Sequence, residues 1–263
     1  METLETTTET EEQKYQLELS EKQLKELVFL LKEQDTDHPM VRTLLAAFDP
    51  SLENKAMSYR QFWLKEAMET FDIKGSPDLD PDLFAEAAAL SPSEHLQKTL
   101  RLNKAIPAKS EKSRSETIIT PILVEVAQRN RGKFNVLSGE RMDVDATRGL
   151  SGECDYVFHT FSLASVLLEP VFALVEAKKG DIDEGLGQCV AQMVGVRELN
   201  QEKGKEIPAI YGCVTNGSVW RFLRLAGNEL VIDSQEYYLS ELDQILGIFQ
   251  FIVDEFGRQT EKK

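Results

Sequence analysis

The sequence predicts a mixed α/β domain preceded by a helical N-terminal region. Two observations lead to this prediction. Apolar residues recur at helical spacing through the first 105 residues, whereas short strand-like runs begin only beyond residue 133. In the second part, a first helix, a group of strands, a second helix, a further group of strands and a closing helix are expected in that order, which is typical of a sheet covered by helices. We therefore divide the chain into an acidic tail expected to be disordered (1–13), a helical region (14–105) and an α/β domain (106–263).

Capping signals followed by apolar faces predict the helices of the first region. Ser20 and Ser58 each begin a capping-box spacing ahead of an apolar face, and Pro92 stands at the first position of a later helix. The turn-rich stretch 75–81 breaks the series. We expect helices over about 20–31, 39–48 and 58–71, a short one ending at residue 90, and another over 95–103.

The second region begins with a helix and continues with strands. A helix from Glu116 to Gln128 contains Pro121, which is tolerated only in the first turn because proline lacks an N–H. Asn216 and Gly217 form a strong hairpin signal between two strand-like runs. We expect strands over 134–137, 141–144, 154–160, 171–178, 210–214, 219–225 and 230–233, and helices over 184–200 and 239–256.

The net charge of −15 is unevenly spread along the chain. Residues 1–116, 117–232 and 233–263 carry net charges of −8, −3 and −4, so the acidity lies mainly in the flanks. The total argues against a histone-like or ribosomal role and against adhesion to anionic membranes, because Lys and Arg dominate both kinds of binding. The nearly balanced middle of the chain still allows a nucleic-acid enzyme.

Targeting and cysteine signals point to a reducing compartment. The Thr- and Glu-rich N-terminus is the opposite of a signal peptide, and no apolar run approaches the ~20 residues that span a bilayer. Cys154, Cys189 and Cys213 are too few and too scattered for a disulfide framework or a zinc site. We therefore expect a cytoplasmic protein with no membrane partner.

Three ionisable residues lie in strands that are otherwise apolar. Side chains alternate across a strand, so Glu176 and Lys178 emerge from the same face at the end of the run 171–178. Asp155 lies within the earlier apolar run 154–160. Charges in half-buried strands are costly unless they are paired or bound to a cation. Two carboxylates can hold Mg²⁺, and a neighbouring ammonium can orient a metal-bound water.

This pattern resembles the PD-(D/E)XK, or restriction-endonuclease-like, superfamily of nucleases. The resemblance consists of Asp155 followed by Glu176-Ala177-Lys178, with a cysteine preceding Asp155 where the superfamily's label has proline. More narrowly, residues 116–238 look like uncharacterised bacterial proteins related to the nuclease domain of type I restriction enzymes. The motif around Asp155 also includes Glu153, which we keep as a further candidate.

The resemblance implies additional site residues on the helices that flank the strands. In such nucleases, a glutamine on the helix after the Glu-x-Lys strand enters the site. Gln188 resembles that residue, and Gln192 lies one turn later on the same face. A glutamate on the helix before the sheet also contributes, and both Glu116 and Glu125 qualify. We prefer Glu116, because it opens the predicted helix after a polar linker.

The resemblance implies a restriction-endonuclease-like mixed sheet flanked by helices, and Mg²⁺- or Mn²⁺-dependent hydrolysis of nucleic acid, DNA more than RNA. Asp155 and Glu176 would bind the ion, Lys178 would position the attacking water, and Gln188 and Glu116 would support substrate or metal. Many such nucleases pair to cut both strands, so a homodimer is a second expected partner. The alternative is a catalytically silent nuclease fold that serves as a binding or scaffolding module, which the missing basic surface favours.

Overall fold

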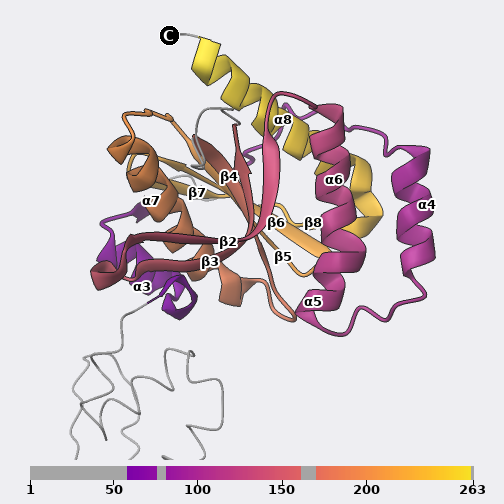
Figure 1. Cartoon of the computed structure of the whole chain (residues 1–263), viewed down its shortest axis with the longest axis horizontal. Helices are drawn as coiled ribbons and strands as arrows, with labels where there is room; N and C mark the ends of the chain where they lie inside the picture. The colour runs from indigo at the N-terminus through magenta and orange to yellow at the C-terminus, as the bar shows by residue number, and fades with distance from the viewer. Residues whose placement is uncertain (1–57, 76–80, 161–169, 262–263) are drawn as a thin grey trace, which may run out of the picture. The chain divides into compact units, whose positions relative to one another are not determined.

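The computed structural model describes residues 58–75, 81–160 and 170–261 (Figure 1). They belong to a compact unit that runs from Lys55 to Lys263. The acidic tail 1–13, the helices expected before residue 57 and most of the break expected over 75–81 lie outside the described residues. No helix in the described ranges combines the length and the apolar character needed to cross a membrane.

A mixed sheet forms the centre of the described unit. Its order is β1-β7-β6-β5-β4-β3-β2, and β8 pairs with β6. The pairs β4–β5 and β1–β7 are parallel, and the other pairs are antiparallel. The mixed α/β class predicted from the sequence is therefore confirmed. The strands are β1 (Lys74–Gly75), β2 (Asn135–Asp145), β3 (Leu150–His159), β4 (Val171–Ala177), β5 (Ile210–Thr215), β6 (Val219–Ala226), β7 (Glu229–Ile232) and β8 (Tyr237–Tyr238).

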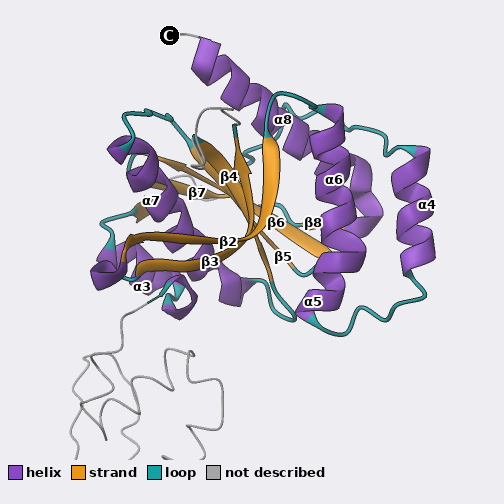
Figure 2. Ribbon diagram, viewed as in Figure 1, coloured by secondary structure: helices purple, strands orange, loops and turns teal. Residues whose placement is uncertain are grey.

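Helices cover both faces of this sheet (Figure 2). One apolar core contains residues of α4, α6 and α8 together with one face of the strands. The second core contains residues of α3 and α7, which connects the parallel strands β4 and β5, together with the other face. The helices are α3 (Leu64–Thr70), α4 (Glu94–Asn103), α5 (Glu111–Arg114), α6 (Thr120–Arg129), α7 (Leu186–Glu202) and α8 (Leu242–Glu261).

The boundary expected between residues 105 and 106 does not divide the described unit. Tyr59 and Phe62 are buried in the α7-side core, and Phe84 and Leu96 are buried in the α8-side core. The segment before residue 105 therefore supplies part of both cores, because the sheet alone leaves apolar surface uncovered on each face.

The helical run before the sheet begins earlier than the sequence predicts. Ser110 caps α5 by accepting a hydrogen bond from the Ser113 amide at 3.0 Å. A π-helical stretch over 115–119 then joins α5 to α6, so that Pro121 lies well inside a continuous helical run. Asn103 Nδ2 donates to the Thr117 carbonyl at 2.8 Å. Because Pro121 has no N–H, that carbonyl would lack its usual α-helical partner, and the Asn103 amide satisfies it instead.

Two expected elements differ from the structure for packing reasons. The short helix expected to end at Leu90 is a turn, because the Leu90 amide donates to Asp243 O of α8 at 2.8 Å and Gly247 of α8 packs against the Ala88 backbone. These contacts override the high helix propensity of the alanines. The helix expected over 58–71 is a 3₁₀ turn, η2 (Tyr59–Gln61), followed by α3, because the backbone between them is extended.

The two strands expected over 134–137 and 141–144 form one strand, β2. Gly139 lies between them with φ +71°, a conformation that other residues rarely adopt. This glycine lets one strand continue through a local irregularity opposite the part of β3 that holds Asp155.

Candidate active site

Asp155 lies where β3 and β4 begin to pair. Regular pairing starts at Tyr156 and Val175, one residue beyond Asp155 in β3. Asp155 Oδ2 accepts a hydrogen bond from the Ala177 amide at 2.7 Å. The Asp155 carboxylate thus accepts the hydrogen bond that a backbone carbonyl of β3 would accept in regular strand pairing. This bond fixes the carboxylate beside the end of β4.

Glu176 and Lys178 lie at that same end and face α7. Glu176 is only 2% exposed, and its Oε1 accepts a hydrogen bond from Lys178 Nζ at 3.0 Å. Gln192 Nε2 donates to Glu176 Oε2 at 2.9 Å. Lys178 Nζ also donates to Gln188 Oε1 at 2.7 Å. The structure therefore joins the strand residues and both predicted glutamines in one hydrogen-bonded chain.

Glycines allow α7 to approach the strand end closely. A Cβ at Gly185 would lie 2.6 Å from Val214 Cγ1 and 2.8 Å from Lys178 Cε, so a larger residue would displace the lysine. Gln188 and Gln192 follow on the buried face of α7, one turn apart, with 2% and 0% exposure. The glutamine positions are thus set by close backbone packing at the start of the helix.

The two carboxyls share a surplus of negative charge. Burial raises the pKa of Asp155, against the hydrogen bond from the Ala177 amide and the charge of Lys178. Burial, and then the charge of Asp155, raise the pKa of Glu176 to about 8, although Lys178 and Gln192 act in the opposite direction. One ammonium is therefore not enough to keep both carboxyls ionised, and a further cation would be stabilised here.

The donor set fits Mg²⁺ or Mn²⁺ better than zinc. In the described part of the chain, no group of three or more His, Cys, Asp or Glu side chains is placed to hold a metal. Mg²⁺ commonly binds through only one or two carboxylates and keeps several waters, which Asp155 and Glu176 can provide. Gln192 Oε1 is also buried without a hydrogen-bond partner in the described residues.

The structure does not bring Glu125 into this cluster. Its Oε2 accepts from Ser93 Oγ at 2.7 Å, and its Oε1 accepts from Arg129 Nε at 2.8 Å. Burial raises the pKa of Glu125, but the hydrogen bonds from Ser93 and Arg129 outweigh it, so the pKa lies below its ordinary value. Glu125 therefore links α6 to the start of α4 and is a structural carboxylate.

Glu116 and Glu153 also have their side chains outside the cluster. The Glu116 side chain is 64% exposed and lies 4.0 Å from Lys112 Nζ. The Glu153 side chain is exposed, and only its backbone carbonyl contacts the cluster, at 3.5 Å from Gln192 Nε2. Neither carboxylate hydrogen-bonds to Asp155 or Glu176.

Two residues that the sequence did not indicate, Glu111 and Arg60, interact electrostatically with Asp155. Burial, and then the charge of Asp155, raise the pKa of Glu111 at the start of α5, whereas Lys178 and Arg60 lower it. The capping spacing of Ser110 and Ser113 could have located Glu111 at the start of a helix. Arg60 gave no signal, because its place depends on contacts far along the chain.

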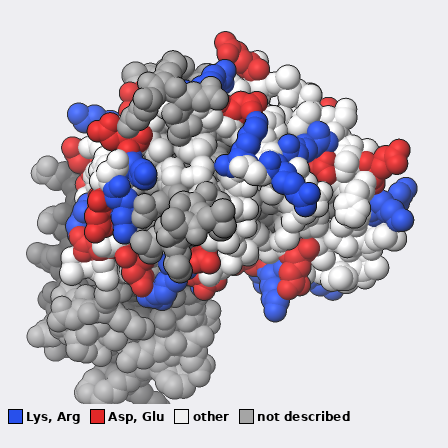
Figure 3. All heavy atoms as spheres, turned by 45° about the horizontal axis from the view of Figure 1, so that its top comes forward, with Lys and Arg blue, Asp and Glu red and all other residues white. Residues whose placement is uncertain are grey.

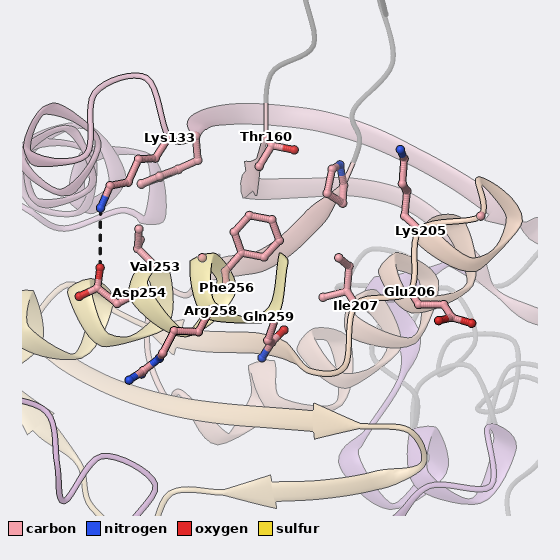
Figure 4. Close-up of a pocket in the computed structure, with 14 residues that line it drawn as sticks. Lys133, Thr160, Lys205, Glu206, Ile207, Val253, Asp254, Phe256, Arg258 and Gln259 are labelled. Atoms are coloured by element: carbon pink, nitrogen blue, oxygen red, sulfur yellow. Dashed lines mark ion pairs between the residues drawn. The ribbon is translucent and has the colours of Figure 1, made fainter. Parts of the chain in front are cut away.

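A large cavity among the described residues lies at the opposite end of β4. It has a volume of about 850 Å³ and shares no residue with the cluster around Asp155 (Figure 4). Thr160 and Pro170 line it near the start of β4, and Lys133 and Asp254 face each other at 3.8 Å on its rim. The candidate site is therefore defined by hydrogen bonds and charge and not by this cavity.

Comparison of the chain with protein-family models, curated proteins and solved structures gives no match. The chemical interpretation of the site therefore depends on its own residues.

Proposed function

We propose that the chain is a metal-dependent phosphodiesterase that hydrolyses nucleic acid, DNA more than RNA, on a restriction-endonuclease-like core. The observation that supports this proposal is the convergence of Asp155, Glu176 and Lys178 at adjacent strand ends. The raised pKa of Glu176 also supports it, because a bound cation would stabilise the ionised carboxylates of Glu176 and Asp155. Mg²⁺ or Mn²⁺ is the proposed ion.

Each residue of the cluster then has a role that its contacts support. Asp155 and Glu176 hold the ion, and Gln192 fixes the direction of the Glu176 carboxylate through its 2.9 Å hydrogen bond. Gln188 holds Lys178 Nζ beside the carboxylates. From there the ammonium orients the attacking water and offsets negative charge on the phosphate. When bound, the ion lowers the pKa of a water and polarises a phosphoryl oxygen.

Glu111 takes the role that the sequence suggested for Glu116. It stands in the first turn of the helical run, it is partly buried, and its carboxyl is affected by the charges of both Asp155 and Lys178. We propose that it supports the metal-bound water or the substrate from the side opposite α7.

Cleavage assays on site variants test this proposal. Wild type, Asp155→Ala and Lys178→Ala are incubated with plasmid and oligonucleotide substrates in Mg²⁺, Mn²⁺ or EDTA. We expect cleavage by wild type in either metal, and none by the two variants or in EDTA. Lys179→Ala is the matched control, because it removes the neighbouring exposed lysine. Cleavage that survives both site substitutions would disprove the assignment.

A catalytically silent nuclease fold is the second candidate function. It is favoured by the saturation of Glu176, since both of its oxygens already accept hydrogen bonds. On the face shown in Figure 3, basic and acidic side chains are interspersed, with no extended basic surface. Calorimetric titration with Mg²⁺ and Mn²⁺ distinguishes the two candidates. Absence of both metal binding and cleavage would favour the silent module.

A further inference from the structure

The 3₁₀ turn η2 is held between two elements of the candidate site. Tyr59 is fully buried, and a Cβ at Gly152 of β3 would lie 3.3 Å from its ring. On the other side, the Tyr59 hydroxyl packs directly against Gly195 of α7. Because β3 holds Asp155 and α7 holds Gln188, this turn is fixed relative to both.

The backbone on either side of Arg60 is also restrained. The Gln61 side chain accepts a hydrogen bond from the Ser58 amide at 3.0 Å, and the Gln61 amide donates to Ser58 O at 3.0 Å. The Phe62 carbonyl then packs against Gly187 at the start of α7. Arg60 is exposed between these anchors, so its side chain extends from a rigid base.

Arg60 lies on a turn that contacts both β3 and α7 of the candidate site. The packing of its neighbours places Arg60 beside the site, because Tyr59 contacts Gly152, three residues before Asp155, and the Phe62 carbonyl contacts Gly187, which precedes Gln188. Even so, the Arg60 guanidinium makes no ion pair or hydrogen bond within the described ranges. Three other arginines, in contrast, form the ion pairs Arg129–Glu125, Arg148–Glu198 and Arg221–Asp183 at 2.6, 2.9 and 2.8 Å.

We propose that Arg60 binds a phosphate group of the nucleic-acid strand next to the bond that is cleaved. The guanidinium presents paired N–H donors that match phosphate oxygens, and a bound phosphate would provide the partner that Arg60 lacks among the described residues. The inference rests on the proposed function and extends it, since it adds a substrate-binding residue from a segment ahead of all the site strands. A second cationic side chain beside Lys178 would further offset the repulsion between the carboxylates and a phosphate.

Oligonucleotide binding measured over a range of salt concentrations tests this inference. A fluorescently labelled oligonucleotide is titrated with wild type and Arg60→Ala, with Ca²⁺ replacing Mg²⁺ so that binding occurs without cleavage. We expect Arg60→Ala to weaken binding about tenfold, as for one lost charge-assisted contact. The slope of log Kd against log salt should fall by about 0.7 to 0.9, the value for one phosphate contact. Arg60→Lys should keep the slope and recover part of the affinity.

Lys65→Ala is the matched control. It removes a positive charge from the same segment, but Lys65 is an exposed residue that lies 3.9 Å from Glu69 on α3. We expect its affinity and salt slope to equal those of wild type. Thermal unfolding of all variants should occur at the wild-type temperature, because both side chains are exposed.

The outcomes separate this inference from the proposed function. If wild type binds and cleaves while Arg60→Ala keeps the wild-type Kd and slope, the inference is wrong and the proposed function stands. Weaker binding with an unchanged slope and a lower unfolding temperature would show a structural role and would also overturn it. If wild type neither binds nor cleaves nucleic acid, the proposed function fails and this inference fails with it.

Discussion

Two buried glutamates, Glu125 on α6 and Glu176 on β4, are similarly buried, but their pKa values are shifted in opposite directions. They are 5% and 2% exposed, and each lies within 3.0 Å of a cationic side chain. The pKa of Glu125 is lowered, because hydrogen bonds from Ser93 and Arg129 outweigh its burial. The pKa of Glu176 is raised to about 8 by burial and by the charge of Asp155.

This contrast shows that a buried carboxylate does not by itself mark a functional site. Glu125 has an arginine and a helix cap to satisfy it, so folding alone explains its position. Glu176 shares one ammonium with a second carboxyl, and that arrangement costs free energy unless a cation or a proton is added. An excess of buried negative charge is what distinguishes the candidate site.

Glu176→Ala tests the contrast with the largest expected effect. Since Glu176 is a proposed metal ligand, we expect the initial rate of plasmid cleavage to fall on the order of 10²- to 10³-fold. Glu125→Ala, assayed at a temperature where it is folded, should cleave at the wild-type rate. Equal losses in the two variants would remove the distinction between the two glutamates.

Glu125→Ala should instead lower the free energy of unfolding by about 2 to 3 kcal/mol. The substitution removes charge-assisted hydrogen bonds to Ser93 and Arg129 and part of the cap of α4. Urea denaturation at pH 7 measures this loss of stability. Substitution of the exposed Glu94 on α4, Glu94→Ala, is the control. Because its pKa is lowered, the stabilisation by Glu125 should be lost as the pH falls through its folded-state pKa. A loss below about 1 kcal/mol would contradict a structural role.

Whereas Glu125→Ala should lower the free energy of unfolding, Glu176→Gln should raise it at alkaline pH. The folded wild type holds a proton that the unfolded chain releases above about pH 4.5, so wild-type stability decreases as the pH rises from there to about 8. The neutral variant avoids this loss, and its new amide can donate to Gln192 Oε1, which lacks a partner in the described residues. We expect a gain of about 2 kcal/mol at pH 8.5 without divalent ions and little difference at pH 4.5. A variant less stable than wild type at pH 8.5 would refute the raised pKa.

Adding Mg²⁺ should stabilise wild type by about 1.4 kcal/mol at ten times its Kd. The effect should be larger at pH 8 than at pH 6, because Glu176 must lose its proton to bind the ion. Differential scanning fluorimetry measures the shift, and Asp155→Asn should abolish it. A shift of equal size in wild type and Asp155→Asn would place the ion elsewhere.

Glu116→Gln should have the smallest effect. Its side chain is largely exposed and lies 4.0 Å from Lys112, so we expect stability to change by less than about 0.5 kcal/mol. Cleavage should stay within about twofold of wild type, whereas Glu111→Gln should reduce it clearly. A large loss in Glu116→Gln would restore the residue that the sequence suggested.

Local patterns in the sequence determined the strand part of the candidate site. The alternation in β4 put Glu176 and Lys178 on one face, and the helical spacing in α7 put Gln188 and Gln192 one turn apart. Both are short-range regularities, because a strand repeats every two residues and a helix nearly every four. All four side chains accordingly meet in one hydrogen-bonded chain.

Only the tertiary structure decided which helical carboxylate and which cation from another segment act electrostatically on Asp155. The resemblance suggested Glu116, because this residue opens the predicted helix after a polar linker. A π-helical stretch, with Asn103 bonded to the Thr117 carbonyl, lets the helical run begin at Glu111 instead. The turn that carries Arg60 lies beside the site because Tyr59 packs between β3 and α7. Such contacts join residues distant in sequence, and no local periodicity records them.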